Sequence, residues 1–420
     1  MDNVTHTLAG LLLAEAALLL HARSAQPASS GLRTAACVVS MTANNLPDLD
    51  FLYVPITGGK LGYLLHHRGH THTLAAGLPC ALIVLFGLWL VLRLRRRRFG
   101  GREWALLGAL AVIGPICHLA LDFSNNYGVH PFWPFNDAWY YGDAVFIIEP
   151  WFWVSTLPAL VYLARSRVAK SVHLLLLGVL LVLVWIVPFV PFVSSAAVSG
   201  ATLLALFALR RWTPSARVLT SFVASVAVLM LFVASSRVAR ASAERQIAEE
   251  HAGAALLDVI VSPVPATPVC FNALVLTLEA DRYVIRSADI APLPAWFPAG
   301  YCAPASRGQT ANLRAPGEAE RRPSAGSVLW RGELAAPARE LVELARSSCQ
   351  AHAFLRFARV PFWRTLSSRS SRMIVGDLRY DRDEALDFAE IELDPARPCP
   401  RFVPPWLPPR RDIPGLSAEY

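Results

Sequence analysis

Residues 72–122 have the sequence HTLAAGLPCALIVLFGLWLVLRLRRRRFGGREWALLGALAVIGPICHLALD, in which two apolar stretches flank a block of arginines. The stretches 72–92 and 104–121 are each close to the roughly 20 apolar residues that a helix needs to cross a bilayer. The arginines between them are Arg93, Arg95, Arg96, Arg97, Arg98 and Arg102. Because positively charged loops stay in the cytoplasm, this stretch predicts two membrane helices joined by a cytoplasmic turn.

The composition supports a membrane protein. Of the 420 residues, 54% are hydrophobic and 17% are charged, whereas soluble proteins have roughly 45–50% apolar and about 25% charged residues. A formal net charge of +8 is also found in nucleic-acid-binding proteins, but here the arginines lie between apolar stretches. We therefore attribute the charge to membrane topology and expect no nucleic-acid partner.

Other apolar stretches predict further membrane helices. The long ones are 145–164, 171–192 and 218–235, and the shorter candidates are 4–20, 33–46 and 195–209. The total predicted is seven or eight spans. The opening MDNVTHTLAG has no basic residue ahead of its apolar run, so it predicts a retained first helix rather than a cleaved signal peptide.

The loops set the predicted orientation. Turns around Arg165 and Arg210 are basic and are expected in the cytoplasm, whereas the connection from Asp122 to Asp143 has no Lys or Arg and is expected outside. This trace also places residues 44–50 and the polar tail beyond residue 236 outside. The expected location is a bacterial inner membrane, with the outer face in the periplasm.

The sequence thus predicts an all-α, multi-pass helical bundle over residues 1–235 and a periplasmic α+β domain over residues 236–420. Alternating apolar residues predict two strand pairs in the tail, Ala273–Leu278 with Tyr283–Ile285 and Met373–Tyr380 with Leu386–Leu393. A helix is expected over Ala335–Ala351, loops over 287–327 and extended chain from Pro395.

Four cysteines lie in the tail: Cys270, Cys302, Cys349 and Cys399. In an oxidising periplasm they could form disulfides, with three possible pairings. Free thiols are the alternative, and the spacing does not decide between them.

The run HHRGHTH at 66–72 carries four histidines in seven residues. Neutral imidazole is a common ligand of zinc, and His66 and His70 would share one face of a helix. The alternative is a polar interfacial loop whose histidines only meet lipid headgroups.

Three other places supply ligand types. His118 and Asp122 stand four residues apart, so a helix would present both to one ion. Asp48 and Asp50 lie in a Pro-Asp string, and His6 lies in the first apolar segment. Each has a structural alternative. His118 could be a buried histidine next to a capping Asp122, Asp48 and Asp50 could belong to a simple turn, and His6 could be a packed interior histidine.

These residues converge in the predicted topology, which puts all of them near the outer face. We therefore predict a site for one or two divalent ions, zinc in first place and manganese in second. The predicted ligands are His6, Asp48, Asp50, His66, His70, His118 and Asp122.

Five strings, MDNVTHTLAG, NLPDLD, HHRGHTHT, HLALD and YYGDAVFIIEP, follow one another within residues 1–165. Together they resemble the YdjM-like family of bacterial inner-membrane metal-dependent hydrolases, also described as LexA-binding. The resemblance implies the same ligands and adds Arg68, His72 and Asp143 as catalytic candidates. The DLRY string at Asp377–Tyr380 is similar to the tail of longer family members.

The expected activity is hydrolysis of a phosphoester or ester of a lipid or an envelope-derived small molecule by a metal-activated water. Asp50 or Asp143 would accept the proton and Arg68 would bind an anionic oxygen. A transporter or metal-handling protein is the first alternative, which Glu15 and Glu149 keep open, and a noncatalytic envelope scaffold is the second. The sequence leaves protein partners unknown, and it has no HExxH, GxSxG or P-loop motif.

Overall fold

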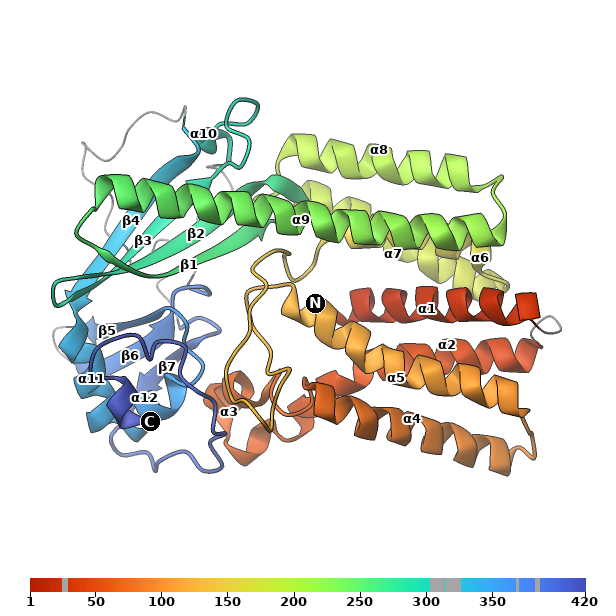
Figure 1. Ribbon diagram of the computed structural model, residues 1–420, viewed down its shortest axis with the longest axis horizontal. Coiled ribbons are helices and arrows are strands. Elements are labelled where there is room, and N and C mark those ends of the chain that lie inside the picture. The colour runs from red at the N-terminus through yellow and green to blue at the C-terminus, as the bar shows by residue number, and fades with distance from the viewer. Residues whose placement is uncertain (25–28, 303–312, 314–325, 368–369, 382–385) are drawn as a thin grey trace.

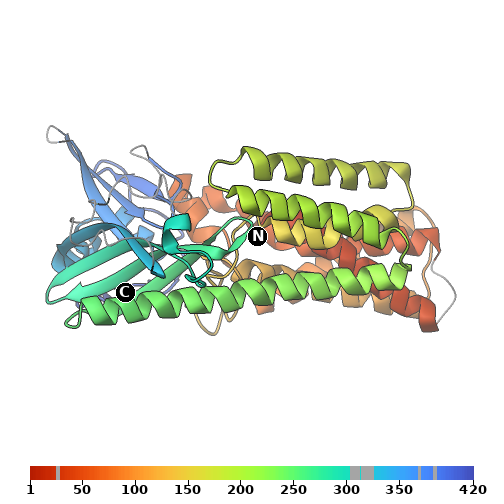
Figure 2. The same cartoon turned by 90° about the horizontal axis from the view of Figure 1, so that it is seen from above.

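The computed structural model describes residues 1–24, 29–302, 313, 326–367, 370–381 and 386–420. The molecule is elongated, with a lobe of helices at one end and a lobe built around two sheets at the other (Figure 1; Figure 2). We call these the helical lobe and the outer lobe. Helix α9 runs through both.

The helical lobe contains α1 (Asn3–Ser24), α2 (Ser30–Asn45), α4 (Leu74–Leu94), α5 (Gly101–Phe123), α6 (Pro150–Leu163), α7 (Arg167–Ile186), α8 (Phe192–Leu209) and the first part of α9 (Pro214–Glu250). Within the described residues, six helices are long and apolar enough to cross a membrane, namely α1, α4, α5, α7, α8 and α9. The predicted multi-pass helical bundle is confirmed, with six such helices against the seven or eight spans predicted.

The difference lies in α2 and α6, which have 16 and 14 residues, fewer than the roughly 20 that a span needs. The stretch 145–164 was predicted as one helix, but α6 begins only at Pro150 because Glu149 caps the helix there. Proline is favoured at the first helical position, where its missing N–H is not needed. Most side chains of α6 are buried by neighbouring helices.

Small residues allow the first helices to approach one another closely. A Cβ atom on Gly10 of α1 would lie 2.8 Å from the Ser40 carbonyl oxygen of α2. A Cβ atom on Gly114 of α5 would lie 2.5 Å from the Ala43 side chain, also on α2. Helix pairs in membranes are held by such close packing because lipid gives no hydrophobic drive between helices.

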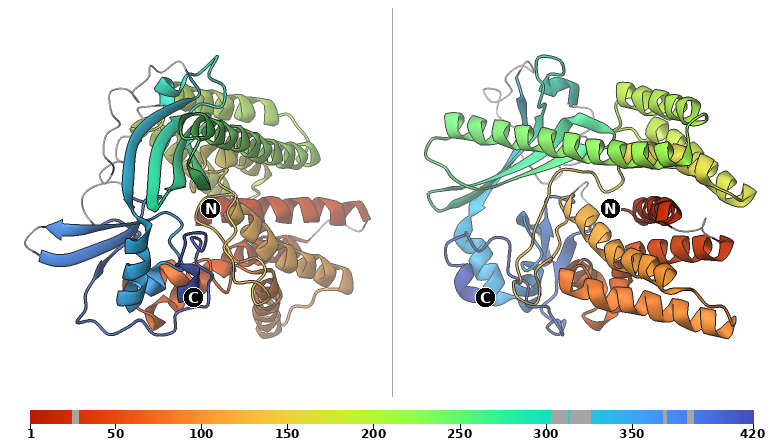
Figure 3. Two further views of the ribbon diagram at one scale, coloured as in Figure 1. Left: turned by 60° about the vertical axis from the view of Figure 1, so that its left-hand side comes forward. Right: turned by 45° about the vertical axis from the view of Figure 1, so that its right-hand side comes forward.

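Helix α9 continues without a break from the helical lobe onto one face of the larger sheet (Figure 3). Its apolar part ends near Ser235, where the sequence predicts the domain boundary, but Ala, Arg and Glu residues that favour helix carry it on to Glu250. Ala239, Ala243 and Ile247 of this second part pack against the sheet. The predicted boundary therefore falls inside a continuous helix.

The outer lobe contains two antiparallel sheets. The larger has the order β1 (Ala255–Val264), β2 (Thr267–Glu279), β3 (Arg282–Ile290), β4 (Val328–Pro337), and the smaller has the order β5 (Pro361–Ser367), β6 (Ser370–Asp377), β7 (Glu390–Leu393). Alternate residues of β1 point to opposite faces: Val259 and Val261 meet α9, and Ile260 packs in the core of the outer lobe. Both predicted strand pairs are confirmed, with the β2–β3 turn at Ala280 and Asp281.

Other tail predictions need correction. Residues 287–290 belong to β3 rather than to a loop, and Ala299–Cys302 form the short helix α10. Residues 303–312 and 314–325 of the predicted loop lie outside the described part of the chain. The predicted helix from Ala335 starts later because residues up to Pro337 complete β4, and α11 (Ala338–Ser347) and α12 (Cys349–Phe354) follow.

All four tail cysteines form disulfides. Cys270 of β2 pairs with Cys302 of α10, and Cys349 of α12 pairs with Cys399. The structure thus selects one of the three pairings that the sequence allowed. Cross-links of this kind typically stabilise a domain by about 2–4 kcal/mol by restricting its unfolded state.

A layer of short elements lies between the lobes, formed by η1 (Leu46–Leu52), η2 (Val54–Ile56), α3 (Gly59–His66) and the loop 124–149. The outer lobe holds this layer through backbone contacts. The Trp406 indole donates to the Leu65 carbonyl at 2.7 Å, and the Arg379 guanidinium donates to the Asn126 carbonyl at 2.6 Å. The predicted histidine-rich run lies in this covered layer.

Candidate metal centre

Four ligand-type side chains meet where α5 ends. His118 and Asp122 lie one turn apart on α5, as the sequence predicts. His72 comes from the turn before α4, and Asp48 comes from η1. One nitrogen or oxygen of each residue lies within 4.8 Å of those of the other three.

The two imidazoles face each other. His72 Nε2 lies 3.0 Å from His118 Nε2, 3.1 Å from Asp122 Oδ2 and 3.4 Å from Asp48 Oδ1. His118 Nε2 lies 3.5 Å from Asp122 Oδ2 and 3.6 Å from Asp48 Oδ1. The His72, His118 and Asp122 side chains are fully buried, and the Asp48 side chain is 15% exposed, so Asp48 is the accessible edge of the group.

Neighbouring groups fix the direction of both imidazole rings. The Nδ1 atom of His118 donates to the Asn44 carbonyl oxygen at 2.6 Å, and the Nδ1 atom of His72 lies 3.2 Å from Asp50 Oδ2. A neutral histidine that donates from Nδ1 carries its lone pair on Nε2. In the ion-bound state, in which both rings are neutral, both Nε2 lone pairs would therefore point at the shared centre, which is how metal-ligating histidines are usually oriented.

Carboxylates dominate the charge around His72. Burial alone would lower the pKa of His72, but hydrogen bonds to Asp122, Asp48 and Asp50 outweigh it and raise the pKa to about 10. A buried place that holds a proton so strongly is one with a large negative potential. The same potential favours a bound cation.

Arg68 provides a positive charge beside the carboxylates. Its Nε atom lies 3.0 Å from Asp122 Oδ2, and its Nη1 atom donates to Asn125 Oδ1 at 2.8 Å. Its backbone adopts a left-handed conformation with φ of 59°, which is uncommon for a residue with a side chain. The backbone N–H donates to Asp50 Oδ2 at 2.8 Å, so Asp50 holds this turn as well as His72.

Asp50 lies directly behind the four-residue group. Besides His72 and the Arg68 backbone, it contacts His67 Nδ1 at 3.1 Å and the Thr71 hydroxyl at 3.2 Å. These contacts use both of its carboxylate oxygens.

His6 also lies next to the group. Its Nε2 atom donates to Asp122 Oδ1 at 3.2 Å, and its ring stacks on His118 with 3.8 Å between centroids. The α-amino group of Met1 contacts the same oxygen of Asp122.

His66 and His70 turn away from this centre. The Nε2 atom of His66 makes a 2.7 Å hydrogen bond with the Thr57 hydroxyl. The ring of His70 packs against Trp133 and Trp406, at 4.7 and 4.8 Å between centroids. The rings of His66 and His70 do lie on the same side, with 6.4 Å between centroids, but the left-handed turn at Arg68 separates them from His72.

Asp143 lies at the contact between the lobes. Its two carboxylate oxygens accept from Arg359 at 2.8 and 2.9 Å, and Arg359 also binds Asp258 at 2.9 Å. The structure thus places Asp143 in an ion-pair network with the outer lobe, not within the four-residue group.

Several residues around the centre were not singled out from the sequence. Asn44 and Asn125 orient His118 and Arg68, and His130 stacks on Trp406 with 3.7 Å between ring centroids. The only available signal was position, since Asn44 immediately precedes NLPDLD and Asn125 lies three residues after Asp122.

Glu15 and Glu149, the two glutamates that support the alternative of a transporter, both have structural partners. Glu15 pairs with Arg33. Glu149 accepts from the backbone N–H groups of Trp151 and Ala266, and complete burial raises the pKa of Glu149 to about 8. Among the described residues, one other group could hold an ion, formed by Asp381, Asp387 and Glu390, and it contains no histidine.

The four-residue group, Arg68 and the helices that carry them all lie in the N-terminal part of the chain. This part matches a protein-family model whose description is YdjM inner membrane protein. The match covers residues 1–192. The resemblance carried by the five sequence strings is confirmed, and the match extends it from residue 165 through α7 to the start of α8.

The YdjM match includes every residue of the candidate metal centre and stops before α9 and the outer lobe. The family name supports an inner membrane location for the chain. No curated protein and no solved structure matches it.

Proposed function

We propose that this protein is a membrane-bound, metal-dependent hydrolase that acts on a phosphoester or ester of a lipid or an envelope-derived molecule. The observation that carries the proposal is the meeting of two imidazole nitrogens and two carboxylates, in which the nitrogens lie 3.0 to 3.6 Å from each other and from the carboxylate oxygens. Ligands about 2.0–2.2 Å from a tetrahedral zinc ion lie about 3.4 Å from one another.

A divalent ion at this centre supplies Lewis acidity and lowers the pKa of a water molecule to near neutrality. We assign its binding to Asp48, His72, His118 and Asp122. The same assignment moves His72 from the catalytic candidates to the ligands. Zinc suits the mixed nitrogen and oxygen set best, and manganese is the second choice.

The surrounding residues have defined tasks in this proposal. Asn44 and Asp50 hold the two imidazoles in their ligating orientation, and Arg68 attracts an anionic oxygen of the substrate. The carboxylates of Asp50 and Asp143 are engaged by hydrogen-bond donors. We therefore propose that both position other groups and do not accept the reaction's proton.

The test is a substrate screen with purified protein in detergent. We expect turnover of a phosphoester or ester in the presence of zinc or manganese, and a loss of at least roughly 100-fold in the His118→Ala variant. Amide, ester, phosphomonoester and phosphodiester probes should be compared. If the wild-type protein hydrolyses none of them, or if His118→Ala retains full activity, the proposed function is wrong.

Ion binding should depend on pH through His72. Because the pKa of His72 is raised to about 10, the ion-free protein carries a proton there that the ion must displace. The affinity for zinc should therefore rise as pH rises, by about tenfold per unit between about pH 6 and about pH 8. Titration calorimetry in buffers with different protonation enthalpies should detect about one proton released per ion, and no release would contradict this.

We also propose that the centre and the outer lobe face the periplasm. The two disulfides of the outer lobe and the arginines between α4 and α5 support this orientation. Alkaline phosphatase, which folds only in the periplasm, should be active when fused after Tyr420 and inactive when fused after Arg98. The opposite pattern would overturn the orientation.

A further inference from the structure

A long groove runs along the helical lobe between α1 and α2 on one side and α6 and α7 on the other. Its volume is about 760 Å³, within the range of roughly 300–1,000 Å³ usual for ligand pockets. Its walls are mainly aliphatic, with Leu8, Leu11, Val38, Leu160 and Leu176 among them. Because these walls belong to helices of the membrane bundle, the groove is expected to contact hydrocarbon rather than bulk water.

The outer end of the groove reaches the candidate metal centre. Asn3 lines the groove, and its amide donates to Asp48 Oδ2 at 2.8 Å. Asp48 is the one accessible member of the four-residue group. One turn deeper, the Thr7 hydroxyl also lines the groove and accepts from the Asn45 amide at 3.0 Å. A molecule in the groove would therefore have its polar end beside Asp48.

The inner end of the groove is polar. Glu15 and Arg33 both line it and form an ion pair, and Arg33 also donates to the Leu163 carbonyl at 3.2 Å. Asn3 and Glu15 are about 18 Å apart along α1 at about 1.5 Å per residue. Arg165 and Ser166, in the turn between α6 and α7 that is expected in the cytoplasm, also line this end, so the groove extends from the metal centre to the inner side of the bundle.

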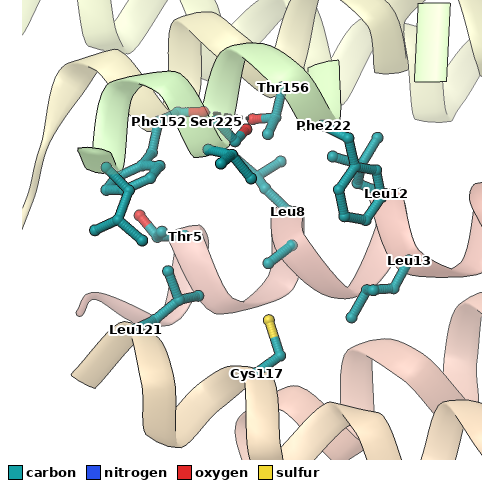
Figure 4. Close-up of a pocket in the computed structure, with 13 residues that line it drawn as sticks. Thr5, Leu8, Leu12, Leu13, Cys117, Leu121, Phe152, Thr156, Phe222 and Ser225 are labelled. Atoms are coloured by element: carbon teal, nitrogen blue, oxygen red, sulfur yellow. Dashed lines mark hydrogen bonds between the residues drawn. The ribbon is translucent and has the colours of Figure 1, made fainter. Parts of the chain in front are cut away.

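A second cavity touches the other side of α1, between α5, α6 and α9 (Figure 4). It is also apolar, and Leu8, Leu12, Cys117 and Phe152 line it, but its volume is only about 150 Å³. This is below the usual range for a ligand pocket. The groove beside α2 is therefore the better place for a long chain.

We propose that the groove binds one acyl chain of an outer-leaflet membrane lipid and so places the ester or phosphoester of that lipid at the metal centre. The aliphatic walls, the length of about 18 Å along α1 and the polar end beside Asp48 all match a single-chain occupant with a polar headgroup. The position of the headgroup at a reactive centre rests on the proposed function. Binding of the chain does not.

Photocrosslinking tests the binding of the chain. The protein is placed in vesicles with a long-chain phosphatidic acid whose acyl chain ends in a diazirine, and the labelled peptides are identified after photolysis. We expect labels on the groove-facing residues of α1, α2, α6 and α7. The Val38→Trp variant, which fills the groove, should lower this labelling by about tenfold.

The matched control is Val112→Trp on α5. Val38 and Val112 are similarly exposed, at 49% and 44%, but Val112 does not line the groove. The control should label as the wild type does. Equal labelling of the groove in both variants, or labels confined to the outer surface of the bundle in the wild type, would overturn the proposal.

Hydrolysis provides the second readout. With phosphatidic acid as substrate, Val38→Trp should lower kcat/KM for the long-chain form by about tenfold relative to a water-soluble short-chain form. If the wild type cleaves both forms and the variant keeps the same ratio, the groove proposal fails while the proposed function stands. If the wild type cleaves neither the long-chain nor the short-chain form, nor any other ester, the proposed function fails. The crosslinking result alone then tests whether the groove binds an acyl chain.

Discussion

Replacing His72 and His118 together by alanine should abolish binding of the divalent ion and lower hydrolysis by about 1,000-fold or more, equivalent to about 4 kcal/mol of transition-state stabilisation. The two imidazoles supply both nitrogen ligands of the four-residue group. The two carboxylates left behind would hold zinc weakly, because they lose the ligands that zinc binds most readily. Metal analysis of the purified variant is the direct measurement.

The wild-type protein should retain about one zinc or manganese ion per chain after dialysis, as a four-ligand site would. The control variant replaces two histidines of the outer lobe, His251 and His352, by alanine. It removes the same number of imidazoles far from the centre and should keep the ion and the activity. Unchanged metal content in the His72→Ala, His118→Ala protein would refute the assignment of this centre.

The second large effect is expected at the contact between the lobes. Arg359 is 4% exposed and binds Asp143 of the loop 124–149 and Asp258 of β1. Replacing Arg359 by leucine leaves buried carboxylates without their partner, which typically costs about 3–5 kcal/mol. The free energy of unfolding in detergent, from denaturant titration, should fall by that amount.

Two further variants show whether the ion pair itself is responsible. Adding Asp143→Asn to Arg359→Leu removes one of the abandoned charges and should recover part of the stability, as a double-mutant cycle measures. Arg397→Ala breaks an exposed pair with Asp394 and should change the stability by no more than about 1 kcal/mol. A similarly small effect of Arg359→Leu would show that the network does not hold the lobes together.

The membrane helices could be predicted because the bilayer sets a minimum apolar length, and α4 and α5 meet it on either side of their arginine turn. The short extent of α6 could not be predicted from the length of its apolar stretch. Its 14 residues are surrounded by other helices, so an apolar stretch there does not need to match the bilayer. The end of the apolar run at Ser235 was visible, but the helix continues to Glu250 because helix propensity does not require apolar residues.

The candidate centre was predictable where ligands lie on one regular element. His118 and Asp122 are one turn apart on α5, so their convergence follows from helix geometry. His66, His70 and His72 lie around a left-handed turn at Arg68, and spacing cannot give side-chain directions through such a turn. The structure selects His72 and leaves His66 and His70 outside the group.

Long-range pairing was not visible in the sequence. Asp143 and Arg359 are 216 residues apart, and without the fold an outer-loop aspartate beside histidines is reasonably placed in the site. The same applies to the two disulfides, since spacing left three pairings open and only the packing of β2 on α10 and of α12 near Cys399 selects one.

Because α9 is unbroken, its length sets the distance and the rotation of the larger sheet relative to the helical lobe. Each residue of an α-helix advances the chain by about 1.5 Å and rotates it by about 100°. Ser236 donates to the Asp143 carbonyl, and Ile247 packs on the larger sheet. The number of residues between them therefore fixes the distance of this sheet from the helical lobe and its rotation about the axis of α9. Inserting a single residue in this segment would rotate and shift the larger sheet relative to Asp143 and so disturb the contact between Arg359 and Asp143.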